Sequence, residues 1–313
     1  MRALSLPHNG QGTSWRLRTS DRRRHGHNVV AMPRSTSRLR TADLTDRVAV
    51  ITGAGSGIGR ELARLCAERG ARLALCDIDD AGLAHTADAA RSRGTQVLTR
   101  RVDVSDAAEM SAFADATFDR FDGVDMVVNN AGVGLVGGFL DTSAKDWQWL
   151  VGVNLMGVVH GCDAFLPTMI ESSRGGHVVN LSSAAGLLAN PQLSAYSATK
   201  FAVLGLSEAL RMELRPHRIG VTAVCPGIID TAITQNSPIR GDGDLDERRA
   251  RLASTYRKRG YSPERVAHKT LRAVGRDRAV APIAAEAHAM YALSRWAPPL
   301  ARWVAARTAE MTK

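Results

Sequence analysis

Short runs rich in apolar residues alternate along this chain with longer segments whose apolar residues recur at helical spacing. Val48–Ile51 is such a run, and Arg60–Arg69 shortly after it carries its apolar residues on one helical face. Runs that are apolar on both faces are typical of parallel strands covered by helices on both sides. The pattern predicts strands at 48–51, 72–76, 96–102, 125–128, 177–183, 220–227 and 279–282, separated by helices at 60–69, about 80–93, 106–121, 145–171, 194–214 and from 262 onwards.

Strands that alternate with helices throughout predict an α/β fold, a Rossmann-type doubly wound parallel sheet in three layers and a single domain. Right-handed crossovers bring the C-terminal ends of the strands to one edge of the sheet. Open sheets of this kind bind ligands at that edge. Asn129, Ser183 and Pro226–Gly227 each lie at the end of a predicted strand, so we expect them near a binding site.

The first 43 residues differ in composition from the rest of the chain. They show neither helical nor strand periodicity and are rich in Arg, Ser, Thr and Gly, so we predict a disordered basic tail at 1–43. Its composition also fits an organelle transit peptide, or a leader that precedes a start at Met32. One folded domain is expected at 44–283, within which 229–262 breaks the alternation and is interpreted as a mobile lid.

The formal net charge of +10 is concentrated in the tail. Residues 1–43 hold nine arginines against two aspartates, which leaves the remaining chain with a net charge of only +3. A basic tail on a nearly neutral body does not indicate the basic face of a nucleic-acid-binding domain, so we expect no nucleic-acid partner. We also find no uninterrupted apolar run of the roughly 20 residues that a membrane span requires.

The four cysteines are widely spaced and include no Cys-x-x-Cys pair. Neither a metal site nor a dithiol redox centre is therefore indicated. Each cysteine is expected to behave as a small buried apolar residue, which fits a reducing compartment, and we expect a cytoplasmic protein. Organelle targeting by the tail stays open as an alternative.

A glycine-rich turn, Thr52-Gly53-Ala54-Gly55-Ser56-Gly57-Ile58-Gly59, joins the first predicted strand to the first helix. Glycines let a backbone approach a pyrophosphate closely, and a helix N-terminus offers it N–H groups and a positive dipole end. Asp77 ends the next strand, where a carboxylate can bind both hydroxyls of an adenosine ribose and repel a 2′-phosphate. This favours NAD over NADP. The alternative is that Asp77 only caps the following helix.

Tyr196 and Lys200 are spaced i and i+4 within a predicted helix, so their side chains share one face. A nearby cation stabilises a phenolate and lowers the pKa of a tyrosine, which is about 10 in a free side chain. The pair can then act as an acid and a base at neutral pH. By itself, this spacing is also common on solvated helix faces.

In this order and context, the motifs resemble the short-chain dehydrogenase/reductase family, in its branch of compact single-domain enzymes, over about 45–283. The family glycine pattern T-G-x-x-x-G-x-G matches Thr52, Gly53, Gly57 and Gly59, which accounts for a spacing unlike the common G-x-G-x-x-G. The remaining family motifs match Asn129-Asn130-Ala131-Gly132, Asn154, Ser183, Tyr196 with Lys200, and Pro226-Gly227 with Thr231.

The resemblance implies an oxidoreductase that moves hydride between a nicotinamide cofactor and a substrate carbon. Tyr196 would exchange a proton with the substrate oxygen, and Ser183 would stabilise the charge on that oxygen. Lys200 would lower the Tyr196 pKa and bind the nicotinamide ribose, while Asn154 would tie a water to Lys200. Ser182 is the rival of its neighbour Ser183, and the family spacing favours Ser183.

The resemblance also implies which residues bind the dinucleotide, with NAD expected and NADP less favoured. Asp103 and Val104 would contact the adenine, and Ile228 would pack near the nicotinamide. The full set expected at the cofactor is Gly53, Ser56, Gly57, Ile58, Gly59, Asp77, Asp103, Val104, Asn130, Ala131, Gly132, Tyr196, Lys200, Pro226, Gly227, Ile228 and Thr231.

We therefore expect an NAD(P)-dependent enzyme that interconverts a secondary alcohol and a ketone, and the alternative is a non-catalytic dinucleotide-binding sensor or scaffold. Apolar residues near the expected pocket favour a lipophilic substrate, unless they belong to the core. These residues are Leu135, Val136, Leu187, Leu188 and Leu193, with Ile229, Ile233, Ile239 and Tyr256 from the lid.

Residues 284–313 are predicted as a C-terminal helical extension that is broken at Pro298–Pro299. Trp296, Leu300, Trp303 and Val304 form an apolar stripe there, with arginines nearby. Such a stripe usually packs on the body or on a partner subunit, and peripheral membrane contact is the less favoured alternative. The resemblance implies a homodimer or homotetramer built on helix pairs.

Overall fold

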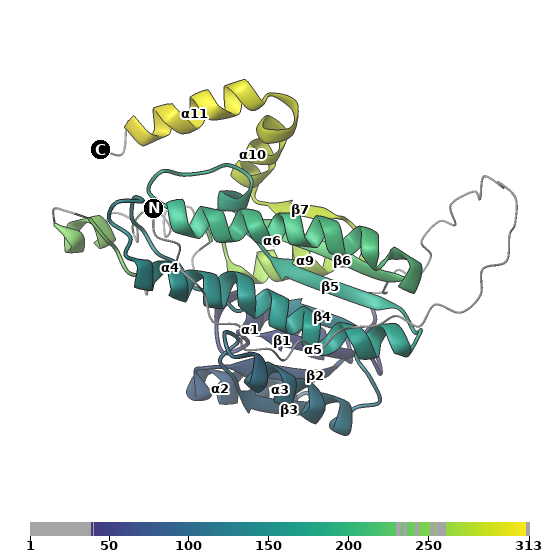
Figure 1. The fold of residues 1–313 in the computed structure, drawn as a ribbon. Coiled ribbons are helices and arrows are strands. Elements are labelled where there is room, and N and C mark those ends of the chain that lie inside the picture. The colour runs from purple at the N-terminus through teal and green to yellow at the C-terminus, as the bar shows by residue number, and fades with distance from the viewer. Residues whose placement is uncertain are drawn as a thin grey trace, which may run out of the picture. The chain divides into compact units, whose positions relative to one another are not determined.

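A computed structural model describes Leu39, residues 41–229, Ile233, 237–241, 244–250, Ser254 and 261–310. Within these residues, seven parallel strands form one sheet in the order β3-β2-β1-β4-β5-β6-β7 (Figure 1). The strands are β1 Val48–Thr52, β2 Arg72–Asp77, β3 Val97–Arg101, β4 Met126–Asn129, β5 Gly176–Leu181, β6 Ile219–Pro226 and β7 Val280–Ile283. The predicted doubly wound sheet is confirmed.

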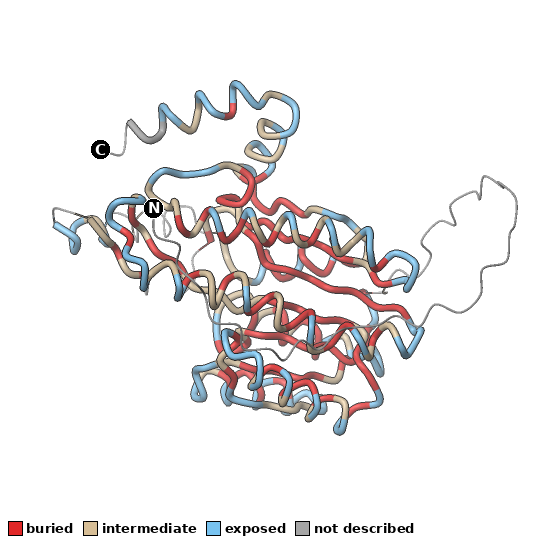
Figure 2. The backbone as a smooth tube through the Cα atoms, viewed as in Figure 1, coloured by how far each residue is buried: buried red, intermediate tan, exposed pale blue. Residues whose placement is uncertain are grey.

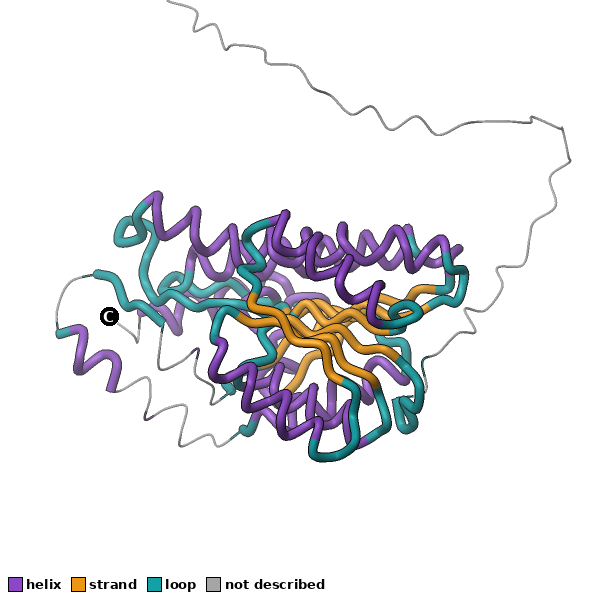
Figure 3. Tube along the Cα trace, turned by 90° about the horizontal axis from the view of Figure 1, so that it is seen from below, coloured by secondary structure: helices purple, strands orange, loops and turns teal. Residues whose placement is uncertain are grey.

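Helices cover both faces of this sheet, as Figure 3 shows from below. The helices are α1 Gly57–Glu68, α2 Asp80–Arg91, α3 Ala107–Arg120, α4 Ala144–Val151, α5 Gly157–Glu171, α6 Ser194–Glu213, α9 Pro263–Gly275, α10 Ala285–Trp296 and α11 Pro298–Glu310. Alternate residues of β1 point to opposite faces of the sheet and pack against different helix layers. Ala49 and Ile51 pack with α1, α2 and α9, whereas Val48 and Val50 pack with α3, α5 and α6. Every residue of β1 is therefore buried, and Figure 2 shows the strands at the centre of the sheet as buried.

β1 and β4 are neighbouring parallel strands, and the direction in which the chain adds strands to the sheet changes between them. From β1 the chain moves outward through β2 and β3, and it returns to β4 on the other side of β1. The loops that follow β1 and β4 therefore leave the sheet toward opposite layers. This switch point is where open parallel sheets bind ligands.

The predicted helix 145–171 contains an irregular turn that the sequence pattern did not reveal. α4 and α5 are joined by a π-helical turn, Gly152–Met156, in which the Gly157 N–H donates to the Gly152 carbonyl. A π turn adds one residue to the turn and is frequent at functional sites. Here it contains Asn154, which is completely buried.

Ala144–Glu171 is also a continuous helical run of 28 residues that is long and apolar enough, by length and composition alone, to cross a membrane. The sequence analysis expected no such segment. Core helices of globular proteins have the same property. In this structure Val158, Phe165 and Met169 of α5 pack into the core beneath the sheet, which accounts for the apolar character of the run.

Asn129 lies at the edge of the sheet as predicted, but its side chain does not face a ligand site. Its amide Nδ2 donates to Asn180 Oδ1 at 2.9 Å, and Asn180 Nδ2 donates to Ser207 Oγ at 3.0 Å. These three residues are buried and connect β4, β5 and α6. Gly161 of α5 packs on the same amide, because a Cβ there would lie 2.0 Å from Asn129 Oδ1.

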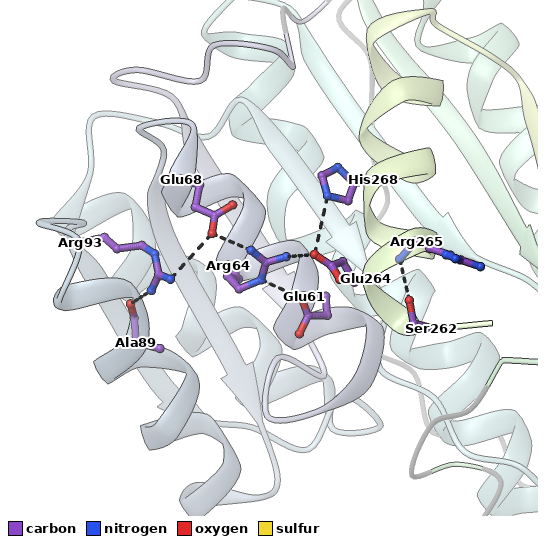
Figure 4. Close-up of polar contacts among 9 residues, drawn as sticks. All are labelled: Glu61, Arg64, Glu68, Ala89, Arg93, Ser262, Glu264, Arg265 and His268. Carbon is purple, nitrogen blue, oxygen red and sulfur yellow. Dashed lines mark hydrogen bonds and ion pairs between the residues drawn. The ribbon is translucent and has the colours of Figure 1, made fainter. Parts of the chain in front are cut away.

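Arg64 connects two helices on one face of the sheet (Figure 4). Its guanidinium donates to Glu61 at 2.8 Å and to Glu68 at 2.6 Å on α1, and to Glu264 on α9 at 2.8 Å. Exposed ion pairs of this kind contribute little free energy individually. The network therefore aligns α1 with α9, while the apolar packing between these helices supplies most of the stability.

The folded body includes residues that we expected to belong to the tail. Thr41 is buried and its Oγ1 donates to the Leu271 carbonyl at 2.8 Å, and Leu39 packs against the core beside it. The body therefore begins before the predicted boundary at residue 44. Residues 1–38 and Arg40 of the predicted tail lie outside the described residues.

The apolar stripe of the C-terminal extension is not covered by the body. Trp296 is 87% exposed, Trp303 58% and Leu300 48%, while Ala301 of α11 is buried. Figure 2 shows that most of α11 is exposed. Trp296, Leu300 and Trp303 therefore do not pack on the body, and packing on a partner subunit, the other part of the expectation, stays a prediction.

Two glycines in helix interiors allow a test of the buried amide network. We expect Gly161→Ala to lower the free energy of unfolding by about 1–3 kcal/mol, because the new methyl group overpacks the Asn129 side chain. Gly205→Ala on α6 is the control, since a Cβ there meets nothing within 4 Å. Replacing this helix glycine should raise stability by up to about 1 kcal/mol. Equal effects of both substitutions in urea unfolding would contradict the packing that we describe.

Candidate active site

The loops after β1 and β4 hold each other in place at the switch point. The Thr52 hydroxyl oxygen accepts the backbone N–H groups of Asn130 and Ala131, each at 3.0 Å. In return, Asn130 Nδ2 donates to the carbonyls of Thr52 at 2.9 Å and Gly53 at 3.0 Å. Asn130 was predicted as a cofactor residue, and its side chain serves to orient the glycine turn.

The glycine turn passes too close to its neighbours for side chains. Gly53 has a φ of +64°, and a Cβ there would lie 2.8 Å from the Ala131 Cα. A Cβ on Gly59 would lie 2.1 Å from the Gly53 carbonyl oxygen. The first turn of α1 is therefore pressed against the end of β1, which brings its N-terminus to the edge of the sheet.

The N-terminus of α1 is suited to an anion. Ser56 precedes the helix in an extended conformation, its side chain makes no capping hydrogen bond, and the first turn contains no acidic residue. Helix N–H groups and the helix dipole then favour a diphosphate at this end. The Cβ-free cradle and the uncapped helix end fit the diphosphate of a dinucleotide.

Asp77 is directed at the glycine turn from the end of β2. Its Oδ2 accepts the Gly55 N–H at 2.7 Å, and its Oδ1 accepts the Asp79 N–H at 3.0 Å. The alternative that Asp77 caps α2 is wrong, because Asp79 is the capping residue and accepts the Gly82 N–H at 3.1 Å. Each Asp77 oxygen retains acceptor capacity for a ligand hydroxyl.

Lys200 is buried on α6, one turn after Tyr196. Its residue is 4% exposed, and Nζ donates to the Leu181 carbonyl at the end of β5 at 3.0 Å. Nζ lies 5.7 Å from the centroid of the Tyr196 ring, so the two side chains share a helix face as predicted. Burial disfavours the charged ammonium and lowers the pKa of Lys200 to about 8.

The structure separates the two serines that follow β5. Ser182 is buried, and its hydroxyl donates to the Lys200 carbonyl at 2.7 Å. Ser183 is half-buried, and its Oγ accepts the Ala185 N–H at 3.1 Å. An accepting hydroxyl can still donate its own proton, so Ser183 can bind a substrate oxygen. The geometry therefore favours Ser183 over its rival.

Asn154 holds the loop after β4. Its Oδ1 accepts the Val133 N–H at 2.8 Å and its Nδ2 donates to the Val133 carbonyl at 2.9 Å. Gly132 lies between this amide and the lysine, since a Cβ there would lie 3.1 Å from Asn154 Oδ1 and 3.4 Å from Lys200 Nζ. The structure thus brings Asn154 close to Lys200, and the water between them stays a prediction.

Comparison with known proteins agrees with this geometry. The model of the family described as short chain dehydrogenase matches residues 47–240. The chain belongs to the short-chain dehydrogenase family.

Three relatives illustrate the range of this similarity. "Probable oxidoreductase EphD" of Mycobacterium tuberculosis is 40% identical over 82% of this chain, which spans only 44% of EphD. "Putative oxidoreductase SadH" of the same species is 43% identical over 80% of this chain and 90% of SadH. A short chain dehydrogenase from Burkholderia phymatum, solved with NAD, is 37% identical with a TM-score of 0.72, covering 76% of this chain and 89% of that one.

Gly227 and Ile228 follow Pro226 at the end of β6, and hydrogen bonds to later segments of the chain hold both of them. The Gly227 N–H donates to the Ile283 carbonyl at 2.9 Å. The Ile228 N–H donates to Glu286 Oε1, also at 2.9 Å. Sequence reasoning missed Glu286, because it lies 58 residues further along the chain in a helix that carries no motif. Thr231 lies outside the described residues.

The predicted adenine contacts lie just beyond the end of β3. Val104 is buried, and its carbonyl accepts His160 Nδ1 at 2.9 Å. Asp103 is half-buried and organises the turn, since its Oδ1 accepts the Ser105 N–H at 2.9 Å. Both residues are thus on the same sheet edge as the glycine turn.

Part of the predicted lid lies against the loop after β4. The Val136 N–H donates to the Pro238 carbonyl at 3.0 Å, and the Arg240 N–H donates to the Val136 carbonyl at 2.7 Å. The Arg240 guanidinium binds Asp146 of α4 through both of its oxygens, at 2.8 and 3.2 Å. This pairing holds the pKa of Asp146 at about 2. The segment 237–241 is therefore fastened beside the site.

The apolar residues expected around the substrate divide into two groups. Leu135, Leu187, Ile229 and Ile239 are buried in the structure. Half-buried residues are Val136, Leu188 and Leu193, and Ile233 is 40% exposed. The second group therefore keeps surface that a ligand could contact, whereas the first group belongs to the interior. Tyr256 lies outside the described residues.

The buried ammonium predicts a distinctive pH dependence of stability. The folded protein releases the Lys200 proton near pH 8, whereas an unfolded lysine releases it near 10.5. Between these values the unfolded state binds more protons, so raising the pH stabilises the folded wild type relative to Lys200→Met. We expect this difference in unfolding free energy to grow by about 1 kcal/mol per pH unit from pH 8 to 10.

Urea unfolding at pH 7, 8, 9 and 10 measures this slope, and Lys145→Met on the exposed surface of α4 is the matched control. The slope should be seen for Lys200→Met and not for Lys145→Met. Identical pH profiles for both variants would show that Lys200 is not desolvated.

Proposed function

We propose that this dehydrogenase uses NAD to interconvert a secondary alcohol and a ketone, with a lipophilic substrate. One observation carries the proposal: Tyr196 and the buried Lys200 lie on one face of α6, and Lys200 binds the Leu181 carbonyl at the end of β5, two residues before Ser183. The cradle formed by the glycine turn and the N-terminus of α1 lies at the same edge of the sheet.

A bound nicotinamide dinucleotide supplies or accepts the hydride at the substrate carbon. Tyr196 exchanges the proton at the substrate oxygen, as a phenolate that takes it from an alcohol or as a phenol that returns it to a ketone. Ser183 donates a hydrogen bond to this oxygen and stabilises the charge that develops on it. The Lys200 ammonium favours the phenolate by its charge.

Removal of the phenol tests the acid and base role. We expect Tyr196→Phe to lower kcat by about 10²–10⁴-fold, because the transferred proton loses its donor and acceptor. Binding of NAD should persist, since the glycine turn is untouched. Tyr291→Phe on α10 is the control and should keep wild-type turnover. A Tyr196→Phe enzyme that is as fast as wild type would exclude the role.

The preference for NAD rests on the placement of the Asp77 carboxylate. Its hydrogen bond with Gly55 holds the Asp77 carboxylate beside the glycine turn. There the carboxylate would accept hydrogen bonds from the hydroxyls of the adenosine ribose and would repel a 2′-phosphate. We expect Asp77→Ala to weaken NAD⁺ binding by roughly tenfold and to improve NADP⁺ binding.

Asp79→Ala is the matched control, because it removes a carboxylate two residues away that only caps α2. This variant should lose stability and keep the cofactor preference. Titration of each variant with NAD⁺ and NADP⁺ gives both dissociation constants. An unchanged ratio in Asp77→Ala would refute the assignment.

The proposal of a lipophilic substrate rests on the accessible residues Val136, Leu188, Leu193 and Ile233. Aliphatic, steroidal and terpenoid alcohols form the screen that tests it. Turnover of any of them also separates the enzyme from a non-catalytic sensor. We further propose a homodimer or homotetramer, because Trp149 of α4, Met156 of the π-helical turn and Phe201 of α6 leave apolar surface exposed.

A further inference from the structure

We propose that Glu286 is a positioning residue for the part of the site that receives the nicotinamide. In this view its carboxylate holds the peptide between Gly227 and Ile228 in the orientation that the cofactor needs. The inference rests on the proposed function, because it assigns the residue to the cofactor site of that enzyme.

The contact between Glu286 and this peptide is direct. Glu286 Oε1 accepts the Ile228 N–H at 2.9 Å across 58 residues of chain. A hydrogen bond from a backbone N–H to a carboxylate is stronger than one to a neutral acceptor. Ile228 is half-buried, so water competes less well for its N–H than it would at an exposed peptide.

The side chain of Glu286 also lies flat against Gly227. A Cβ on Gly227 would lie 2.3 Å from Oε1, 2.7 Å from Cδ and 2.9 Å from Cγ. No other residue fits at position 227 unless the glutamate moves away. The glycine of the Pro-Gly pair is thus explained by packing in this chain, because Glu286 occupies the space that a side chain would need.

The chain segment that carries Glu286 is itself anchored. β7 pairs with β6, and the Ile283 carbonyl accepts the Gly227 N–H at 2.9 Å. α10 begins two residues later, and Ala287 in its first turn is completely buried. Glu286 lies in that first turn, where the helix dipole stabilises a carboxylate. The segment from Ile283 to Glu286 therefore accepts the N–H groups of two successive residues at the end of β6, Gly227 and Ile228.

The consequence for the reaction follows from what comes next in the chain. Ile229 is buried immediately after the held peptide, and the predicted lid begins there. Without the Glu286 acceptor, the Ile228 peptide can rotate and the nicotinamide loses a preformed surface. Preformed sites bind more tightly because less ordering is needed on binding. Loss of Glu286 should therefore weaken cofactor binding and leave the Tyr196 chemistry intact.

Three substitutions at Glu286 distinguish the contributions of its side-chain length, its acceptor oxygen and its negative charge. Glu286→Gln keeps the length and an acceptor oxygen, Glu286→Asp keeps the charge and shortens the reach, and Glu286→Ala removes both. We expect the Kd for NAD⁺ of the Asp and Ala variants to rise roughly tenfold, and that of the Gln variant to stay within about twofold of wild type. Glu264→Ala, which removes a first-turn acid from α9, is the control.

Amide hydrogen exchange of the cofactor-free proteins gives a second readout. Exchange at residues 227–229 should accelerate in the Asp and Ala variants, and it should stay at the wild-type rate in the Gln and Glu264→Ala variants. Wild-type Kd and exchange rates in Glu286→Asp would overturn the proposal. A wild type that does not bind NAD⁺ would instead overturn the proposed function, while the exchange rates would still test the Glu286 contact.

Discussion

The site depends on one buried ammonium at the junction of β5 and α6. Lys200 Nζ is removed from water and donates to the Leu181 carbonyl, while its backbone carbonyl accepts the Ser182 hydroxyl. Both contacts tie the same turn of α6 to the end of β5. Gly186 makes this approach possible, because a Cβ there would lie 2.6 Å from the Lys200 carbonyl oxygen. Burying a charge is costly, and the lowered pKa of Lys200 is the sign of that cost.

The rest of the site is assembled by backbone contacts around this charge. Thr52 and Asn130 fasten the glycine turn to the loop after β4, and Asn154 fastens the next residues of that loop. On the far side, Glu286 holds the end of β6. Each of these polar side chains binds main-chain groups, so their common effect is to hold the loops in one defined arrangement. The side chains that touch substrate can then be few.

The fold could be predicted from the chain because the central strands β1, β4, β5 and β6 are almost completely buried on both faces and are therefore mostly apolar. The Tyr196 and Lys200 pair could also be predicted from the sequence, since helical spacing alone places both residues on one face. Other features depend on contacts between distant segments, which a linear pattern does not contain. Asn129 lies at the predicted edge but points into the core, and the π turn at Asn154 changes hydrogen bonding without changing composition. Glu286 meets Ile228 only once β7 has paired with β6.

The central claim is that the buried Lys200 controls the acidity of the Tyr196 phenol. Carbon-13 labelling of the tyrosine ring at Cζ allows each of the four tyrosines to be titrated by NMR, and Tyr196→Phe assigns the signal. The account predicts that Tyr196 titrates well below the ordinary value of about 10 and that Lys200→Met moves this titration upward. A Tyr196 signal that titrates at the same pH with and without the lysine would contradict it.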